Sequence, residues 1–189
     1  MGIVKIGRFL IGAGQRSFVL AEAGVNHNGS LSLAKKLVDA AKRAGADAVK
    51  FQTFKTEKLV IRSTPQFNML RKLELSERDF RVLFKHCLKK KIIFLSSPFD
   101  EDSADFLEAL GVPAFKIGSG EITHFPLLSH VARKRKPIIL STGMSNSGEV
   151  EEAVNVVRKA GCRHLALLHC VSNYPADPKD VNLNSMETM

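Results

Sequence analysis

Short apolar runs alternate along the whole chain with segments of helical periodicity, and this alternation limits the possible folds more than any other feature. In the helical segments apolar residues recur every three or four positions, as in Leu33, Leu37 and Ala41. The apolar runs are nearly continuous, which is typical of strands buried on both faces of a parallel sheet. These runs are residues 17–22, 47–52, 92–97, 114–119, 137–142 and 164–170. The sequence therefore predicts an α/β fold in which helices cover a parallel sheet.

Residues at the ends of the helical segments support this fold class. Ser30 or Ser32 is placed to cap a first helix. Ser76 and Asp79 resemble a capping box before a second one. A glycine follows three of the helical segments and precedes a strand, where a left-handed residue often ends a helix. These glycines are Gly45, Gly111 and Gly161.

Two segments stand outside the alternation. Residues 1–14 predict a small hairpin that could close the bottom of a barrel. Residues 53–75 form a longer excursion after the second strand, and they include Pro65 and Asn68. Long connections at this end of a sheet usually carry function.

Polar side chains occur at the C-terminal end of every predicted strand. They include Glu22, Lys50, Gln52, Ser97, Lys116, Ser119, Ser141, Thr142 and His169. A barrel site draws residues from the ends of many strands on one rim, whereas an open doubly wound sheet concentrates them at one switch point. No Gly-x-Gly-x-x-Gly follows the first strand. The pattern therefore favours a (β/α)₈ TIM-type barrel.

The chain is short for such a barrel, which typically needs about 250 residues. It has 189 residues and stops roughly where the sixth helix should begin. We therefore expect a barrel truncated after about six βα units, with the hairpin at 1–14 and the βα units at 17–189.

The net charge of +9 invites a test for nucleic-acid binding. The basic stretches at 89–91 and 133–136 both fall late in helical patterns, where cations favour the helix C-terminus. We expect solvated helix ends there, since no RNA-binding aromatic signature or zinc-finger spacing is present. A positive field also favours a small phosphorylated or carboxylated substrate.

No apolar run approaches the roughly 20 residues that span a bilayer, so we expect no membrane partner. The three cysteines (Cys87, Cys162 and Cys170) are scattered and odd in number, which does not suit a disulfide framework. A cytoplasmic location fits this cysteine usage best.

Lys50 and Lys116 both interrupt apolar runs. A lysine in a buried strand is costly unless it is paired or bound to a ligand. Each lysine is a candidate for a Schiff base or for an electrostatic clamp on a phosphate or carboxylate. Glu22 is a candidate general base or the partner of a lysine.

The stretch "FKIGSGEI" at 115–122 places donors and an acid beside Lys116. Ser97, Ser119 and the backbone of Gly118 and Gly120 could donate to phosphate oxygens. Glu121 could orient a lysine or move a proton. The six histidines show no metal-ligand spacing, and the pair His169–Cys170 is weak evidence for a metal.

Four stretches strongly resemble the N-acetylneuraminate (sialic acid) synthase family in the same order along the chain. They are "VLAEAGVNHNGSLSLAKKLVDAAKRAGADAVKFQT", "IFLSSPFDEDSADFLEALGVPAFKIGSGEITHFPLL", "PIILSTGMS" and "LLHCVSNYPADPKDVNL". The resemblance implies a (β/α)₈ barrel followed by a small antifreeze-like domain. It implies condensation of phosphoenolpyruvate with an N-acylated amino sugar, such as N-acetylmannosamine, to give a nonulosonic acid and phosphate.

The resemblance also implies roles for residues that match the family's motifs. The positions that surround phosphoenolpyruvate correspond to Lys50, Ser97, Lys116, Ser119, Ser172 and Tyr174. Glu22 matches a catalytic, sugar-contacting glutamate and Glu121 an acidic active-site position. Gln52, beside Lys50, is an expected substrate-binding amide.

Other parts of the family's machinery have no counterpart in these residues. The family's divalent metal, manganese or magnesium, lies on two histidines at the ends of the seventh and eighth strands, which would follow Met189. The antifreeze-like domain, which implies a homodimer, would also follow. We therefore expect an incomplete, weakly active or inactive fragment. The alternatives are a Schiff-base aldolase and a non-catalytic module that binds phosphate or sugar.

Overall fold

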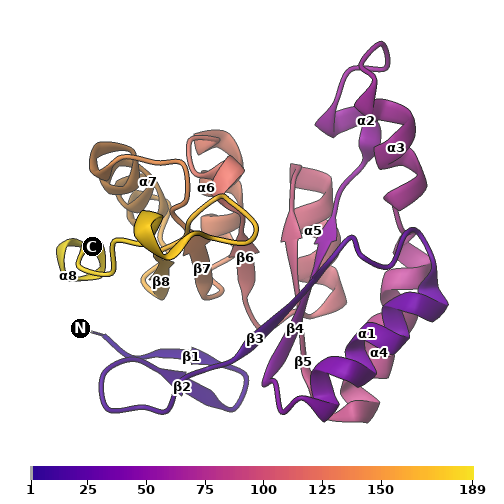
Figure 1. Ribbon diagram of the computed structural model, residues 1–189, viewed down its shortest axis with the longest axis horizontal. Coiled ribbons are helices and arrows are strands. Elements are labelled where there is room, and N and C mark those ends of the chain that lie inside the picture. The colour runs from indigo at the N-terminus through magenta and orange to yellow at the C-terminus, as the bar shows by residue number, and fades with distance from the viewer. Residues whose placement is uncertain (1) are drawn as a thin grey trace.

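The computed structural model describes residues 2–189, and its strands form two parallel sheets preceded by a hairpin (Figure 1). The first sheet contains β3 (Leu20–Gly24), β4 (Ala48–Thr53) and β5 (Ile93–Pro98) in that order. The second contains β6 (Phe115–Ile117), β7 (Ile138–Ser141) and β8 (Leu165–Leu168). All four strand pairings within these sheets are parallel. The six predicted strands are therefore confirmed.

The two sheets meet where β5 and β6 lie against each other. No closed barrel forms within residues 2–189, because no pairing joins β8 to β3. The confirmed fold class is an α/β arrangement of parallel strands, and the eight-stranded barrel stays a prediction.

The helices cover the outer faces of both sheets (Figure 1). The main helices are α1 (Leu31–Arg43), α4 (Glu77–Lys90), α5 (Glu101–Leu110), α6 (Phe125–Arg133) and α7 (Ser147–Lys159). The shorter helices and helical turns are α2 (Thr56–Leu59), α3 (Gln66–Leu73), η1 (Ser119–Glu121), η2 (Pro178–Asp180) and α8 (Ser185–Thr188). One large apolar cluster between helices and strands includes Phe51, Phe80, Phe94 and Phe115. Burial of this cluster fixes which face of each strand points inward.

Most of the predicted helix ends are confirmed. The Ser30 side chain accepts a hydrogen bond from the Leu33 amide and caps α1. Ser76 accepts from the Asp79 amide at 3.1 Å. The three predicted glycines have φ values of +82°, +90° and +100°, in the left-handed region.

The capping box predicted at Ser76 was wrong in one respect. Its hydroxyl donates to the Asp79 carboxylate at 2.7 Å, so that carboxylate does not close the reciprocal bond to the backbone. The reciprocal pair occurs instead at Asn146 and Glu149, at the start of α7.

An antiparallel hairpin of β1 (Val4–Ile6) and β2 (Phe9–Ile11) lies at the N-terminal end of the strands (Figure 1). Val4 and Ile6 are buried in a second apolar cluster, together with Leu95 and Ile139 from β5 and β7. The hairpin therefore covers the end of the sheets that lies opposite α2 and α3.

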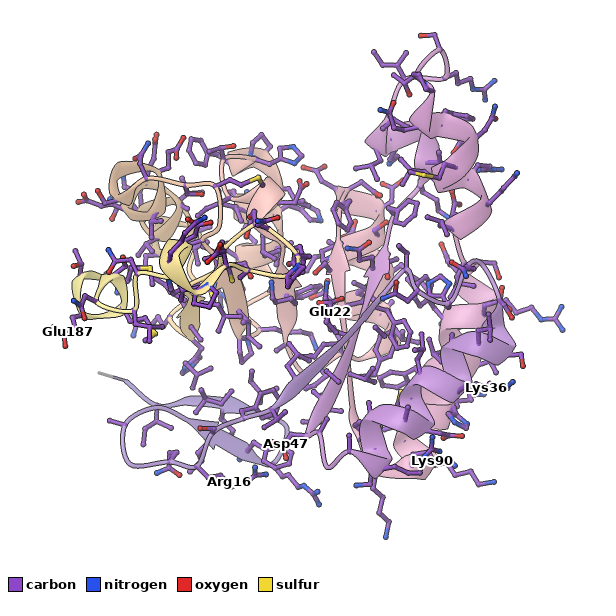
Figure 2. The ribbon with its side chains drawn as sticks, viewed as in Figure 1. Arg16, Glu22, Lys36, Asp47, Lys90 and Glu187 are labelled. Atoms are coloured by element: carbon purple, nitrogen blue, oxygen red, sulfur yellow. The ribbon has the colours of Figure 1, made fainter. Side chains whose placement is uncertain are left out.

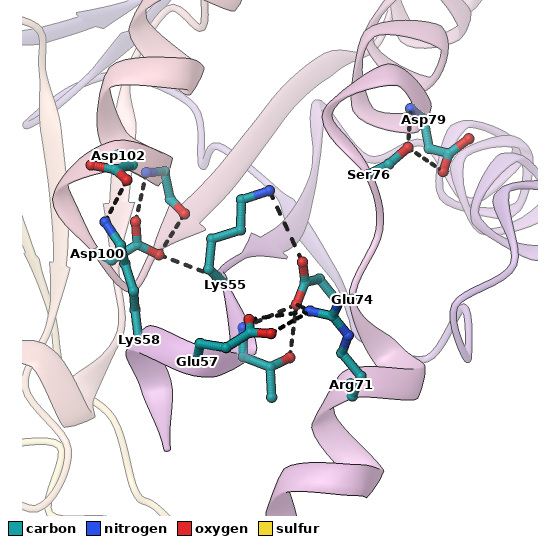
Figure 3. A network of polar contacts seen from close by, with 11 residues as sticks. Lys55, Glu57, Lys58, Arg71, Glu74, Ser76, Asp79, Asp100 and Asp102 are labelled. Atoms are coloured by element: carbon teal, nitrogen blue, oxygen red, sulfur yellow. Dashed lines mark hydrogen bonds and ion pairs between the residues drawn. The ribbon is translucent and has the colours of Figure 1, made fainter. Parts of the chain in front are cut away.

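The predicted excursion is built of two short helices, α2 and α3, which project beyond the end of β4 (Figure 1). A network of polar contacts holds it in place (Figure 3). Glu74 accepts from the Thr56 amide at 2.9 Å and from the Thr56 hydroxyl at 2.8 Å. The Lys55 amide donates to Asp100, which caps α5. The excursion is therefore tied to the start of α5.

The two basic stretches lie at helix C-termini, as predicted. Lys90 pairs with Asp39 of α1 at 2.9 Å. Lys134 pairs with Glu108 of α5 at 2.8 Å. These cations link neighbouring helices. Among residues 2–189, no helix has the length and apolar character needed to cross a membrane.

Candidate active site at the carboxyl ends of the strands

Glu22 and Lys50 form an ion pair between the neighbouring strands β3 and β4. They are paired in the strand register, and Lys50 Nζ lies 2.9 Å from Glu22 Oε2. The Lys50 side chain is only 6% exposed, whereas that of Glu22 is 54% exposed. Figure 2 shows Glu22 between the two sheets, while the Arg16–Asp47 pair lies toward the hairpin end. Lys50 is therefore a buried cation whose counter-charge remains accessible.

Lys116 is a second buried cation, on β6. Its Nζ donates to the Ile117 carbonyl at 2.7 Å and to Ser141 Oγ at 2.6 Å. Burial, followed by repulsion from Lys50, lowers the pKa of Lys116 to about 8. The two predicted lysines therefore act on one another across the two sheets.

Ser141, at the end of β7, is the only side chain among residues 2–189 that accepts from Lys116. The sequence placed Ser141 on the polar rim but gave it no role. Cys170 Sγ donates to the same Ser141 oxygen at 3.4 Å. The sequence feature that could have indicated a role for Ser141 is its position at the end of a strand, which it shares with Ser97.

Gly143 brings Ser119 and Ser172 together. The Gly143 amide donates to Ser119 Oγ at 3.0 Å. A Cβ at Gly143 would lie 2.9 Å from Ser119 Oγ and 2.5 Å from Ser172 Oγ. A side chain there would force the two hydroxyls to move, and these hydroxyls form a small polar cradle.

Ser97 and Gln52 lie opposite each other in the register of β4 and β5. Ser97 is 1% exposed, and its hydroxyl has no hydrogen-bond partner within residues 2–189. A buried hydroxyl without a partner is uncommon and calls for an explanation, such as a catalytic role or a bound water or ion. Gln52 is half-buried beside it.

Glu121 and Tyr174 are the two remaining candidates from the sequence. Glu121 is bonded to His124 Nδ1 at 3.2 Å, three residues along the chain, and no lysine pairs with it among the described residues. Tyr174 is 92% exposed. The structure therefore does not bring these two side chains to the lysines.

A cavity of about 410 Å³ lies beside Cys170, between the ends of β7 and β8 and the start of α7. Its polar lining includes Thr142, Asn146 and His169. Within residues 2–189, no three His, Cys, Asp or Glu side chains lie close enough together to hold a metal ion. The described residues therefore do not fit the divalent metal that the resemblance implies.

The combined arrangement suits a small, highly charged anion. Two buried ammonium groups supply positive charge, and the hydroxyls of Ser97, Ser119, Ser141 and Ser172 supply donors. Glu22 adds one accessible carboxylate next to Lys50. The lysines and serines can bind an anion, and Glu22 can transfer a proton to or from it.

Comparisons with known proteins place the chain in a family. The model of the NeuB family matches residues 37–189. The N,N'-diacetyllegionaminic acid synthase of Legionella pneumophila is 48% identical to the chain, over 94% of the chain and 55% of that protein. The chain thus spans about half the length of the curated relatives it matches.

Solved structures show the same arrangement of elements. An N-acetylneuraminic acid synthetase from Leptospira borgpetersenii, solved with citrate, has a TM-score of 0.94 and 35% identity, over 99% of this chain and 65% of that one. A truncated 3-deoxy-D-arabino-heptulosonate 7-phosphate synthase from Thermotoga maritima has a TM-score of 0.67 and 17% identity, over 88% of this chain and 55% of that one. The second likeness concerns the fold alone. By sequence and by structure, the chain belongs to the NeuB family.

Proposed function

We propose that the chain carries the phosphoenolpyruvate-binding part of a synthase that joins phosphoenolpyruvate to an N-acylated amino sugar. The products would be a sialic acid-like nonulosonic acid and phosphate. The observation that supports this most strongly is the pair of buried lysines. Lys50 and Lys116 are 5% and 6% exposed, and their mutual repulsion would be relieved by an anion between them.

In the proposed reaction, C3 of phosphoenolpyruvate forms a carbon–carbon bond with the aldehyde carbon of the open-chain sugar. Water adds at C2, and the bond between C2 and the phosphate oxygen breaks to release phosphate. Lys50 and Lys116 would neutralise the carboxylate and phosphate throughout. Ser119 and Ser172 would donate to the phosphate oxygens.

Glu22 is the proposed proton carrier. Its carboxylate is held by Lys50 at 2.9 Å and is still 54% exposed, so it can reach a sugar hydroxyl or a water molecule. A carboxylate that is fixed by one hydrogen bond and has a free, accessible oxygen can orient a reactant and accept its proton. No step is assigned to a divalent metal, because the described residues offer it no fitting cluster.

The test is calorimetric titration of this chain with phosphoenolpyruvate, followed by a phosphate-release assay with N-acetylmannosamine and Mn²⁺. We expect saturable binding of phosphoenolpyruvate that is about tenfold or more weaker in Lys116→Met. Binding that is absent, or equal in the variant, would overturn the proposal. Phosphate release by this chain would show that further ligands are not needed. A homodimer and a cytoplasmic location stay predictions.

A Schiff-base aldolase is the second candidate, and the lowered pKa of Lys116 favours it. With that pKa at about 8, a sizeable fraction of the amine is free at mildly alkaline pH. Borohydride treatment in the presence of pyruvate would then attach a stable adduct to Lys116, detectable by peptide mass. The absence of an adduct would exclude this candidate.

A further inference from the structure

Cys170 touches both halves of the proposed anion site. Its Sγ donates to Ser141 Oγ at 3.4 Å, on the side of Lys116. Its carbonyl oxygen would lie 3.3 Å from a Cβ at Gly143, on the side of Ser119. This residue therefore lies between the lysine and the hydroxyl cradle.

The hydrogen bonds of Ser141 can be counted. A hydroxyl has one proton to donate and two lone pairs to accept with. Lys116 Nζ donates to this oxygen at 2.6 Å and Cys170 Sγ donates to it at 3.4 Å. Both lone pairs are thus occupied, and no acceptor for the hydroxyl proton occurs within residues 2–189. The proton is therefore available to a bound ligand.

We infer that Cys170 is a positioning residue for phosphoenolpyruvate, since its S–H group holds Ser141 with the hydroxyl proton free to donate to the bound anion. This inference rests on the proposed function. Cys170 acts through Ser141, whose oxygen accepts from both Cys170 and Lys116 and whose proton is donated onward to the anion. Such chains of hydrogen bonds strengthen one another in a buried site.

The other two thiols show what a structural cysteine looks like in this fold. Cys87 and Cys162 are fully buried, and Cys162 Sγ donates to the backbone carbonyls of Lys136 and His164. Cys170 is only half-buried and donates to a side chain that a catalytic lysine candidate also contacts. These surroundings favour a role for Cys170 in the candidate site over a purely structural role.

The test compares Cys170→Ala with Cys170→Ser in calorimetric titrations with phosphoenolpyruvate and with inorganic phosphate. Alanine removes the donor, whereas serine keeps one at nearly the same size. We expect alanine to weaken phosphoenolpyruvate binding roughly three- to tenfold and serine to stay within about twofold of wild type. Cys162→Ala is the matched control, and it should leave the affinity unchanged.

A double-mutant cycle with Ser141→Ala separates positioning from packing. If Cys170 acts through Ser141, then Cys170→Ala has no further effect once Ser141 is alanine. Additive losses would overturn the inference, as would equal affinities of the alanine variant and wild type. A wild-type chain that binds neither ligand would overturn the proposed function, and the inference with it.

A measurement on the folded wild-type chain covers the case in which the alanine variant does not fold. Methylthiolation of Cys170 with methyl methanethiosulfonate converts the thiol to a disulfide and removes its S–H donor. Cys87 and Cys162 are buried, so Cys170 is the accessible thiol among the described residues. We expect weaker phosphoenolpyruvate binding that dithiothreitol restores. Unchanged binding by the fully modified chain would contradict the inference.

Discussion

Lys50 and Glu22 face each other across β3 and β4 with 2.9 Å between Nζ and Oε2, yet only the lysine is buried. The buried cation needs a counter-charge, and the accessible carboxylate supplies it while keeping one side open. An anionic substrate can therefore approach Lys50 without first breaking the pair. Because of this difference in burial, we expect Glu22 to contribute to the stability of the fold without being required for the binding of the anion.

Glu22→Gln should destabilise the chain by about 1–2 kcal/mol, because it leaves Lys50 buried without its counter-charge. Phosphoenolpyruvate affinity should not fall, since the substrate then becomes the main partner of Lys50. Urea unfolding and calorimetric titration measure the two effects. Glu121→Gln is the matched control, because Glu121 pairs with His124 and with no lysine within residues 2–189. A large loss of phosphoenolpyruvate affinity in Glu22→Gln would contradict the prediction that Glu22 contributes to stability and not to binding.

Lys116→Met keeps most of the length of the side chain and removes its charge. Phosphoenolpyruvate binding should weaken about tenfold or more, because a charge-assisted hydrogen bond to the substrate is lost. Titration calorimetry measures the change. In the control, Lys136→Met, the altered side chain contacts the Val112 carbonyl and no residue of the candidate site. Equal affinities of the two variants would remove Lys116 from the site.

Phosphoenolpyruvate affinity should fall as the pH rises above about 8, the pKa of Lys116. Burial and Lys50 lower this pKa, while Cys170 and Glu22 oppose the shift. Below that pH the free protein already carries the ammonium form that an anion prefers. Above it, binding must take up a proton, which costs up to about tenfold in affinity per pH unit.

Calorimetry at pH 8.5, in buffers of different ionisation enthalpy, measures this proton uptake directly. Lys116→Met should remove the part of the proton uptake that is due to Lys116, while any uptake by other groups remains. Proton uptake that persists unchanged in this variant would assign the titration to another group.

Gly143→Ala should weaken phosphoenolpyruvate binding roughly tenfold, because its Cβ would overlap Ser119 Oγ and Ser172 Oγ and push the cradle apart. Gly120→Ala is the matched control, since a Cβ there meets no atom of residues 2–189 within 4 Å. Titration calorimetry with phosphoenolpyruvate compares the two variants. If both bind phosphoenolpyruvate equally, the two hydroxyls do not contact the substrate.

Thr56→Val should destabilise the excursion of α2 and α3 by about 1–2 kcal/mol, because Glu74 loses a hydroxyl donor in a partly buried position. Limited proteolysis should then cut faster near residues 60–64. Thr64→Val is the control within the same excursion, since the exposed Thr64 hydroxyl donates to the Ile61 carbonyl and takes no part in the Glu74 network that the described residues form. Equal cleavage rates would show that the network does not hold the excursion.

The sequence by itself determined the order of the strands and helices and most of the helix ends. These features depend on residues within a few positions of one another, such as Ser30 with Leu33. It also indicated that Lys50 and Lys116 have partners, because a lysine inside a buried strand is costly without one.

Only the tertiary structure decided which partners those lysines have. Ser141 lies 25 residues beyond Lys116, and Cys170 lies 29 beyond Ser141, yet parallel pairing of β6, β7 and β8 brings all three together. The register of a parallel sheet is set by packing of whole strands and helices, so no local pattern encodes these contacts. For the same reason the sequence did not indicate that Glu121 pairs with His124 or that Tyr174 is exposed, because the path of a loop decides where its side chains lie.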